Sequence, residues 1–267
     1  MMQVIKNFNE KKVSDYLDTR KYRKVLLKFH HGLGDAMMFN AVCLNALKKA
    51  YPEIEFHYST HLGQEELFGF HSENPEDYDI AFEFRFPMAE WDKTDETKAE
   101  KCLREEIGLE PSGEYYASPV RFKSPFVALH FFSTCMPNSI GFRNEPEMIK
   151  IWKMVEEHGF VPIDTHMRHQ FDNSKNKLYS FQTRNMEGIP ANISTLGGVL
   201  SVCRGFIGVA SGNFPLALSI LPPENILFIR TGFSVKKITR LPIEEFNPRN
   251  PQEWRKLDSF LERLKKV

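Results

Sequence analysis

The sequence of 267 residues contains only four cysteines, and none of them belongs to a C-x-x-C pair. Cys43, Cys102, Cys135 and Cys203 stand far apart, which argues against a zinc cage or a dense disulfide framework and predicts buried, reduced thiols. The sequence also lacks an apolar run of about eighteen residues, the length that a membrane helix needs, and its amino terminus lacks the apolar core of a signal peptide. We therefore expect no transmembrane segment and a cytoplasmic location.

An excess of charge of either sign is absent as well. The 35 basic residues balance 35 acidic ones, so the formal net charge is zero. Such a chain has no overall field that gathers nucleic acid or anionic membrane. A nucleic-acid partner is therefore not favoured, although a local basic groove beginning at Lys236, Lys237 and Arg240 stays open.

The histidines lack the spacing of a metal site. His166 and His169 stand three residues apart, but "DTHMRHQFDNSKNK" is typical of a polar loop, and no third ligand follows at a useful spacing. We expect no metal and no cofactor.

Short apolar runs alternate with helical patterns along the first half of the chain. Strands are expected at 25–29, 54–59 and 78–86, and helices at 36–50 and 95–109. Residues 111–125 concentrate Pro, Ser and Gly, which is typical of a domain boundary.

A second series of strands and helices follows that boundary. Strands are expected at 126–132, 160–164, 206–210 and 225–229, and helices at 146–159, 194–205, 214–221 and 250–267. Alternation on this scale favours an α/β fold with parallel sheets covered by helices on both faces. We expect two Rossmann-like doubly wound domains facing a cleft, residues 1–118 and 119–267.

The turn "HHGLGDAMM" places a carboxylate between an expected strand and helix. Gly32 and Gly34 let the backbone turn and approach a ligand, and Asp35 could accept a proton from a hydroxyl group there. The alternative is that Asp35 only caps the helix. His30 and His31 flank the turn and could touch an acceptor, or could be partly buried residues at a strand end. In "EFRFPMAEW", residues 83–91, a loop that packs its aromatic side chains inward is favoured over an acceptor site.

The stretch "GFIGVASGNFPLALSIL", residues 205–221, is the second candidate. Ser211, Gly212 and Asn213 follow an expected strand and precede a helix, where free amides suit a phosphate or pyrophosphate. The alternative is an ordinary helix cap built from Ser211 or Asn213.

At this point the sequence resembles a known family. "KVLLKFHHGLGDAMMFNAVCLNALKKAYPEIEFHYST" is similar to the opening of the ADP-heptose:lipopolysaccharide heptosyltransferases, of glycosyltransferase family 9, in which a strand, a "GD" turn, a helix and an "LK-x-x-YP" ending recur. "SPFVALHFFS", "GFVPI" and "ISTLGGVLSVCRGFIGVASGNFPLALSIL" match the family's order in the second half. The resemblance spans roughly residues 24–230.

The resemblance implies a metal-independent GT-B glycosyltransferase that moves a sugar from a nucleotide-diphosphate donor to a carbohydrate or other hydroxyl acceptor. It implies Asp35 as the general base, an acceptor-side first domain containing Gly32, Gly34, His30 and His31, and a donor-binding second domain. The donor-binding residues that it implies are His130, Ser133, Thr134, Arg143, Thr195, Ser211, Gly212 and Asn213.

Two departures from the family keep different functions open. The family carries an acidic residue where this chain has Ala210, and a His in the stretch occupied here by Phe214 and Pro215. A nucleotide-sugar-binding protein without turnover would explain both. A GT-B enzyme that modifies nucleic-acid bases and a nucleotide-sugar epimerase also stay open.

Overall fold

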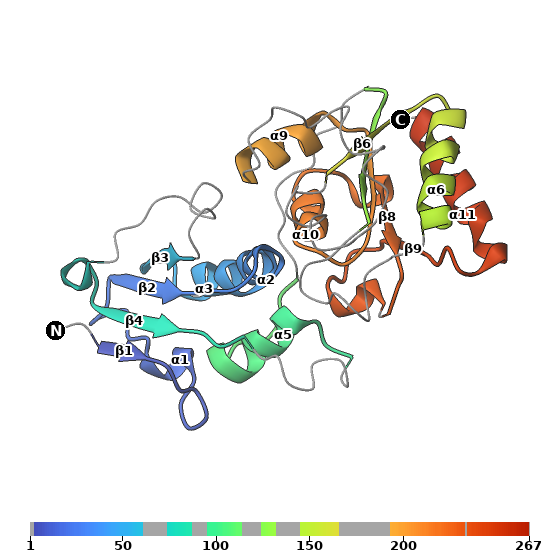
Figure 1. Cartoon of the computed structure of the whole chain (residues 1–267). Coiled ribbons are helices and arrows are strands. Elements are labelled where there is room, and N and C mark those ends of the chain that lie inside the picture. Colours follow the sequence, from blue (N-terminus) through green and yellow to red (C-terminus); the bar gives the residue numbers. More distant parts are fainter. Residues whose placement is uncertain are drawn as a thin grey trace. The chain divides into compact units, whose positions relative to one another are not determined.

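The computed structural model describes residues 3–60, 74–86, 95–113, 124–131, 145–165, 193–232 and 234–266. The chain divides into two compact units: the first unit is residues 1–115 with 236–240, and the second unit is residues 116–235 with 241–267. Each unit contains one parallel β-sheet with helices packed on it (Figure 1), so the α/β fold predicted from the sequence is confirmed.

Four parallel strands form the sheet of the first unit, in the order β1-β4-β2-β3. Their bounds are β1 Gln3–Ile5, β2 Lys24–Lys28, β3 Glu55–Ser59 and β4 Ile80–Glu83. The middle three residues of β2, "VLL", are fully buried. This continuous apolar run is typical of a parallel strand covered on both faces.

The long helix predicted after β2 is present and consists of three consecutive segments. They are α2 Leu33–Met38, the π-helical η1 Phe39–Leu44 and α3 Asn45–Ala50. A second composite helix joins α5 Lys98–Cys102 to the π-helical η4 Leu103–Ile107 and ends at Gly108. Gly108 has a φ of +82°, and a Cβ there would lie 2.5 Å from the Ser14 hydroxyl oxygen, so glycine is required. Short helices α1 Val13–Tyr16 and η2 Pro75–Asp77 complete the described first unit.

Five parallel strands form the sheet of the second unit, in the order β6-β5-β7-β8-β9. Their bounds are β5 Phe126–His130, β6 Val161–Asp164, β7 Gly205–Gly208, β8 Ile226–Ile229 and β9 Glu244–Phe246. The main helices are α6 Glu145–Glu157, α9 Ile193–Val202, α10 Asn213–Leu218 and α11 Trp254–Lys266. Short 3-10 turns cover Pro223–Asn225 (η5) and Pro251–Glu253 (η7). A further 3-10 turn, Val235–Lys237 (η6), runs from the second unit into the segment 236–240 of the first unit.

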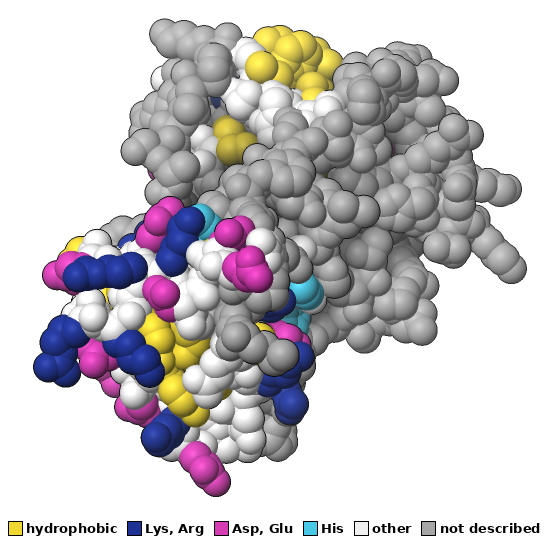
Figure 2. Space-filling view, turned by 90° about the vertical axis from the view of Figure 1, so that its left-hand side faces the viewer, with side chains coloured by type: hydrophobic (Ala, Val, Ile, Leu, Met, Phe, Trp, Pro, Cys, Tyr) yellow, Lys and Arg dark blue, Asp and Glu magenta, His cyan; other side chains and the backbone are white. Residues whose placement is uncertain are grey.

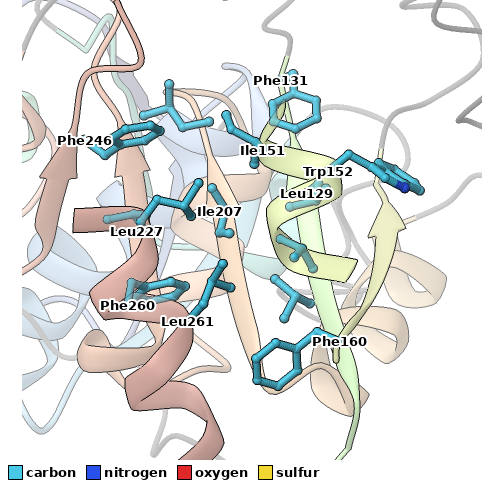
Figure 3. Close-up of a cluster of buried hydrophobic side chains, with 14 of the residues drawn as sticks. Leu129, Phe131, Ile151, Trp152, Phe160, Ile207, Leu227, Phe246, Phe260 and Leu261 are labelled. Carbon is cyan, nitrogen blue, oxygen red and sulfur yellow. The ribbon is translucent and has the colours of Figure 1, made fainter. Parts of the chain in front are cut away.

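The core of the second unit lies between its sheet and two helices (Figure 3). Side chains such as Leu129, Ile207 and Leu227 of the central strands meet Ile151 of α6 and Phe260 of α11. The apolar spacing of the last helix is confirmed, because its side chains at 257, 260, 261 and 264 are all fully buried. The helix therefore docks by one face, as an amphipathic helix does.

A second helix covers the opposite face of this sheet. Phe206 of β7 and Phe228 of β8 alternate with the core residues named above and contact Phe214 of α10, at ring-centroid distances of 6.4 and 5.0 Å. Because successive strand residues point to opposite faces, α10 lies across the sheet from α6 and α11. The sheet of the second unit is thus covered on both faces, as the sequence predicts.

Some sequence expectations need correction or fall outside the described residues. The strands β1 and β9 and the helix α1 were not predicted, and each is only three or four residues long. Cys43, Cys102 and Cys203 are free and buried as expected, whereas Cys135 lies outside the described residues. Within the described ranges, no helix is long and apolar enough to cross a membrane.

Candidate active site

Asp35 occupies the third position of α2, immediately after the turn that follows β2. The helix begins after Gly32, so Gly32 and not Asp35 occupies the N-cap position. Asp35 lies in the first turn, where an acid also favours the positive end of the helix, and its role as a base stays a prediction. Its side chain retains 23% of its exposure, so the carboxylate is accessible at the carboxyl end of the sheet. Open α/β sheets bind their ligands at this end.

The Asp35 carboxylate forms an ion pair that the sequence pattern does not predict. Lys98 Nζ donates a hydrogen bond to Asp35 Oδ1 at 2.8 Å, although 63 residues separate the two in sequence. The Lys98 side chain is only 8% exposed. A buried ammonium group needs such a compensating anion, because burial removes its hydration.

Lys98 also lies over an aromatic ring. Its Nζ is 4.8 Å from the ring centroid of Phe86, within the range of a cation–π contact. Phe86 is fully buried and also packs against Phe29. The expected inward packing of residues 83–91 is thus confirmed for Phe86, while Met88 and Trp91 lie outside the described residues.

A buried carboxyl group, that of Glu106, supports the backbone at Phe86. Phe86 has a φ of +50°, which is uncommon for a residue with a side chain. Glu106 of η4 accepts a hydrogen bond from the Arg85 backbone N–H at 3.2 Å. Burial raises the pKa of Glu106 to about 7, and the N–H donors of Arg85 and Phe86 oppose that rise.

The glycine at the start of the turn does not have the conformational role expected of it. Gly32 has a φ of −59° and a ψ of 157°, which any residue can adopt. A Cβ at this position would have no heavy atom within 4 Å. The backbone turn therefore does not require glycine at position 32, and its role in ligand approach stays a prediction.

The two histidines before the turn make different contacts. His30 is exposed, and its Nε2 lies 2.9 Å from the Ser59 hydroxyl oxygen at the end of β3. His31 is partly buried, with Nε2 3.2 Å from the Phe84 carbonyl oxygen and its ring against Phe29. Both belong to the carboxyl end of the sheet, and their contact with an acceptor stays a prediction.

A buried polar cluster lies at the carboxyl end of the second sheet. His130, the last residue of β5, is fully buried, and its Nδ1 accepts a hydrogen bond from the Asn213 side-chain amide at 2.8 Å. The same amide donates to the Thr165 carbonyl oxygen at 3.0 Å. The Asn213 side chain therefore links α10 to β5 and to the end of β6.

The Ser211–Asn213 turn begins a short helix. The Ser211 hydroxyl oxygen accepts a hydrogen bond from the Asn213 backbone N–H at 3.3 Å. Gly212 is the residue before α10, and its φ of −58° is one that any residue adopts, so the turn does not require glycine at this position. Ser211 and Gly212 are partly exposed, whereas Asn213 is buried. The contact of the three residues with a diphosphate stays a prediction.

The remaining sequence candidates are less informative. Thr195 is partly exposed near the start of α9. Ser133, Thr134 and Arg143 lie outside the described residues, as do His166 and His169. Among the described residues, no group of three His, Cys, Asp or Glu side chains is arranged to hold a metal ion.

Arg240 belongs to the first unit, although it lies between two strands of the second unit in sequence. Its guanidinium donates to both carboxylate oxygens of Glu100, at 2.6 to 3.1 Å, and to the Asp95 carbonyl oxygen. The charge of Arg240 is thus paired within the protein. Over the described part of the face in Figure 2, basic and acidic side chains are interspersed.

Lys98 and Glu106 are the residues of this region that sequence reasoning missed. One signal was present for Lys98. Thr97 and Glu100 form a capping box, which places Lys98 at the first position of a helix. A cation is unfavourable at this end of a helix, so a lysine there points to an anionic partner elsewhere in the fold.

No protein-family model matches the sequence, and no curated protein matches it. Solved structures do match its fold. A family 9 glycosyltransferase from Veillonella parvula aligns with a TM-score of 0.58 at 10% identity, over 85% of this chain and 86% of the other. E. coli heptosyltransferase WaaC with ADP aligns with a TM-score of 0.57 at 10% identity, over 90% and 99%.

A third similar structure is the iron-containing dodecameric glycosyltransferase TibC from enterotoxigenic E. coli. It aligns with a TM-score of 0.56 at 12% identity, over 85% of this chain and 63% of TibC. These matches establish that the chain has the fold of the GT-B heptosyltransferases of family 9. At this level of identity they establish the fold alone.

Proposed function

We propose that this protein is a glycosyltransferase that moves a sugar from a nucleotide-diphosphate donor to a hydroxyl acceptor, with Asp35 as the general base. The carboxylate takes the acceptor's hydroxyl proton while the acceptor oxygen bonds to the anomeric carbon of the sugar. The bond from that carbon to the diphosphate breaks, and its electron pair leaves with the diphosphate.

The observation that carries this proposal is the accessible Asp35 carboxylate at the carboxyl end of the first sheet. Lys98 occupies one oxygen of this carboxylate, Oδ1, and the side chain of Asp35 is 23% exposed, so the group can meet a hydroxyl from the solvent side. Asp35 keeps part of its surface open in a chain that has the fold of heptosyltransferases.

The proposed donor side is the second unit. Ser211 and Gly212 lie at the carboxyl end of β7, beside the cluster of His130 and Asn213. We propose that this edge holds the diphosphate, with the backbone amides near Ser211 stabilising its charge. WaaC is solved with ADP, so ADP and ADP-heptose are the first probes to test.

The test replaces Asp35 with Asn and measures ADP release from ADP-heptose, with water and with a panel of hydroxyl acceptors. The change keeps the shape of the side chain and removes the proton acceptor, so we expect kcat to fall by about 10²–10⁴. ADP affinity should stay unchanged. Because TibC is iron-containing, the assay is run with and without a chelator.

The stability of the Asp35→Asn variant must be measured beside its rate. The change leaves the buried Lys98 without an anion, so we expect a loss of about 1–3 kcal/mol in stability. The matched control is Glu83→Gln, which makes the same chemical change in an exposed 2.8 Å pair with Lys6. Full activity of a folded Asp35→Asn protein would reject Asp35 as the base.

A nucleotide-sugar-binding protein without turnover is the second candidate. Phe214, in the stretch where the family pattern has a His, is fully buried between Phe206 and Phe228 and is thus part of the core. This candidate predicts that ADP-heptose binds to the wild-type protein but that no ADP is released with any acceptor.

A further inference from the structure

Lys98 lies in a position that is unfavourable for a lysine in three respects. It is the first residue of α5, where the positive end of the helix dipole repels a cation. Its side chain is 8% exposed, so most of the hydration of its ammonium group is lost. The side chain is long and flexible, and fixing it costs conformational entropy. The contacts of Lys98 must offset all three.

Two contacts of the Lys98 ammonium group offset these costs, and both fix the position of Nζ. Nζ donates to Asp35 Oδ1 at 2.8 Å and lies 4.8 Å from the centre of the Phe86 ring. The capping box between Thr97 and Glu100 fixes the first turn of α5, with Thr97 N–H donating to Glu100 at 2.7 Å. The ammonium therefore approaches Asp35 from a rigid helix end.

The ring under the ammonium is held as firmly. Phe86 is fully buried among Phe29, Phe39 and the His31 ring. Its backbone has a positive φ, and such a conformation persists only when the surroundings impose it. The hydrogen bond from Arg85 N–H to Glu106 is part of those surroundings.

The ion pair is open on one side only. The Lys98 side chain is 8% exposed, whereas that of Asp35 is 23% exposed. The buried Lys98 ammonium therefore binds Oδ1 of Asp35, while the Asp35 side chain remains partly exposed to solvent. This arrangement orients a carboxylate and leaves it able to meet a hydroxyl group.

We propose that Lys98 is a positioning residue, which holds the Asp35 carboxylate in the orientation that accepts the acceptor's proton. This inference rests on the proposed function, since Lys98 acts only through Asp35. Lys98 itself touches neither donor nor acceptor. The proton moves from the acceptor oxygen to the Asp35 carboxylate, as described above.

The test compares Lys98→Met and Lys98→Arg with wild type, using ADP release from ADP-heptose. We expect Lys98→Met to lower kcat by about 10- to 100-fold, because an unfixed base loses part of the advantage of orientation. The KM for ADP-heptose should stay within about twofold of wild type, because a substitution far from the donor changes donor binding by no more than that. Lys98→Arg keeps the cation and should recover most of the rate.

The matched control is Lys6→Met. Lys6 forms an ion pair of the same length, 2.8 Å, with Glu83 in the same unit, but both side chains are well exposed. Exposed pairs contribute little, so kcat and melting temperature should match those of wild type. A similar fall in both lysine variants would mean that the loss is not specific to Lys98, and would overturn the proposal.

The decisive comparison repeats Lys98→Met in the Asp35→Asn background. If Lys98 acts through Asp35, the double variant should have the same residual kcat as Asp35→Asn alone. A further tenfold loss there would overturn the proposal. The double variant also leaves neither charge unpaired, so a further loss in it would overturn the proposal even if Lys98→Met alone does not fold, and Lys98→Gln then supplies the rate of a single variant.

The proposed function and the positioning role fail in different ways. No ADP release by the wild-type protein, or full activity of Asp35→Asn, removes the proposed function. A low rate for Asp35→Asn together with an unchanged kcat for Lys98→Met keeps the function and removes the positioning role.

Discussion

Glu106 carries a carboxyl group inside the first unit, where it is 9% exposed and has its pKa raised to about 7 by burial. In an unfolded chain a Glu side chain has a pKa near 4.3. Between these two values the folded protein binds the proton more tightly than the unfolded chain does. The stability that Glu106 contributes is therefore fully present at acid pH and is lost as the pH rises through about 7.

Glu106→Gln should remove this part of the pH dependence. The amide keeps an oxygen that accepts from Arg85 N–H, and it does not ionise. We expect the stability of wild type relative to the variant to decline between pH 4.5 and 7.5, by up to about 1.4 kcal/mol per pH unit. Urea unfolding at a series of pH values measures this difference.

Glu105→Gln is the control for that experiment. Glu105 is the sequence neighbour, but its side chain is 39% exposed and is paired with Arg104. Its removal should leave most of the pH dependence in place, because burial is the largest cause of the raised pKa of Glu106 and the charge of Glu105 is a smaller one. A Glu106→Gln variant whose stability stays parallel to that of wild type across this range would contradict a raised pKa.

Residue identity alone predicted Asp35 as a candidate but not its partner. The carboxylate stands after a glycine turn at the end of an apolar run, which is a local pattern. The pairing with Lys98 depends on α5 packing against α2, and 63 residues separate the two side chains. No periodicity in the sequence specifies that contact. The capping box of Thr97 and Glu100 gives only the place where the helix begins.

At the level of elements, the junction between β7 and α11 is tightly packed. A Cβ at Gly205 would lie 2.7 Å from Leu264 Cδ1 and 3.1 Å from the Asn225 carbonyl oxygen. Leu264 is itself fully buried. The strand therefore begins with glycine because α11 lies against its backbone.

This junction allows a compensation experiment. Gly205→Ala should destabilise by about 1–3 kcal/mol through overpacking. Leu264→Ala should destabilise by about 2–5 kcal/mol through the cavity that it leaves. In the double variant the added methyl group occupies part of that cavity, so the total loss should be smaller than the sum.

Denaturant unfolding of wild type, the two single variants and the double variant measures the coupling free energy between positions 205 and 264. Leu216→Ala is a suitable control, because that buried leucine belongs to α10, which covers the other face of the sheet. Its effect should add to that of Gly205→Ala. If the losses in stability caused by Gly205→Ala and Leu264→Ala simply add in the double variant, the contact between a Cβ at position 205 and Leu264 does not limit packing.

The elements that the sequence predicted share one property: each buries a long apolar stretch. The runs "VLL" in β2 and "ILFI" in β8 are buried throughout, and α11 has four buried residues at helical spacing. By contrast, β1 and β9 are three-residue strands in which only Phe246 is buried, and they carry too few residues for a periodic signal. The sequence predicted the stretches of η1 and η4 as helical, but not that they are π-helical.

At the scale of the whole molecule, the two units should respond differently to a nucleotide. We propose that ADP binds to the second unit, so saturating ADP should slow amide hydrogen exchange in segments that contain β5, β7 and the start of α10. Exchange in β2 and α2 of the first unit should change little. Mass spectrometry of the exchanged peptides measures this pattern.

Two variants sharpen the nucleotide experiment. Gly212→Val should weaken ADP binding, since a φ of −58° accommodates valine and the added bulk acts on the ligand. Asp35→Asn should retain the affinity of wild type. Protection by ADP confined to the first unit would contradict the donor-side assignment.

The segment Lys236–Arg240 has a consequence for anyone who wishes to divide this protein into halves. A fragment that ends at residue 115 keeps Glu100 but loses Arg240, whose guanidinium binds both oxygens of that carboxylate. Glu100 is also the acid of the capping box that begins α5, the helix of Lys98. An excised first half therefore needs residues 236–240 grafted onto it, because a single cut in the chain does not separate complete folding units.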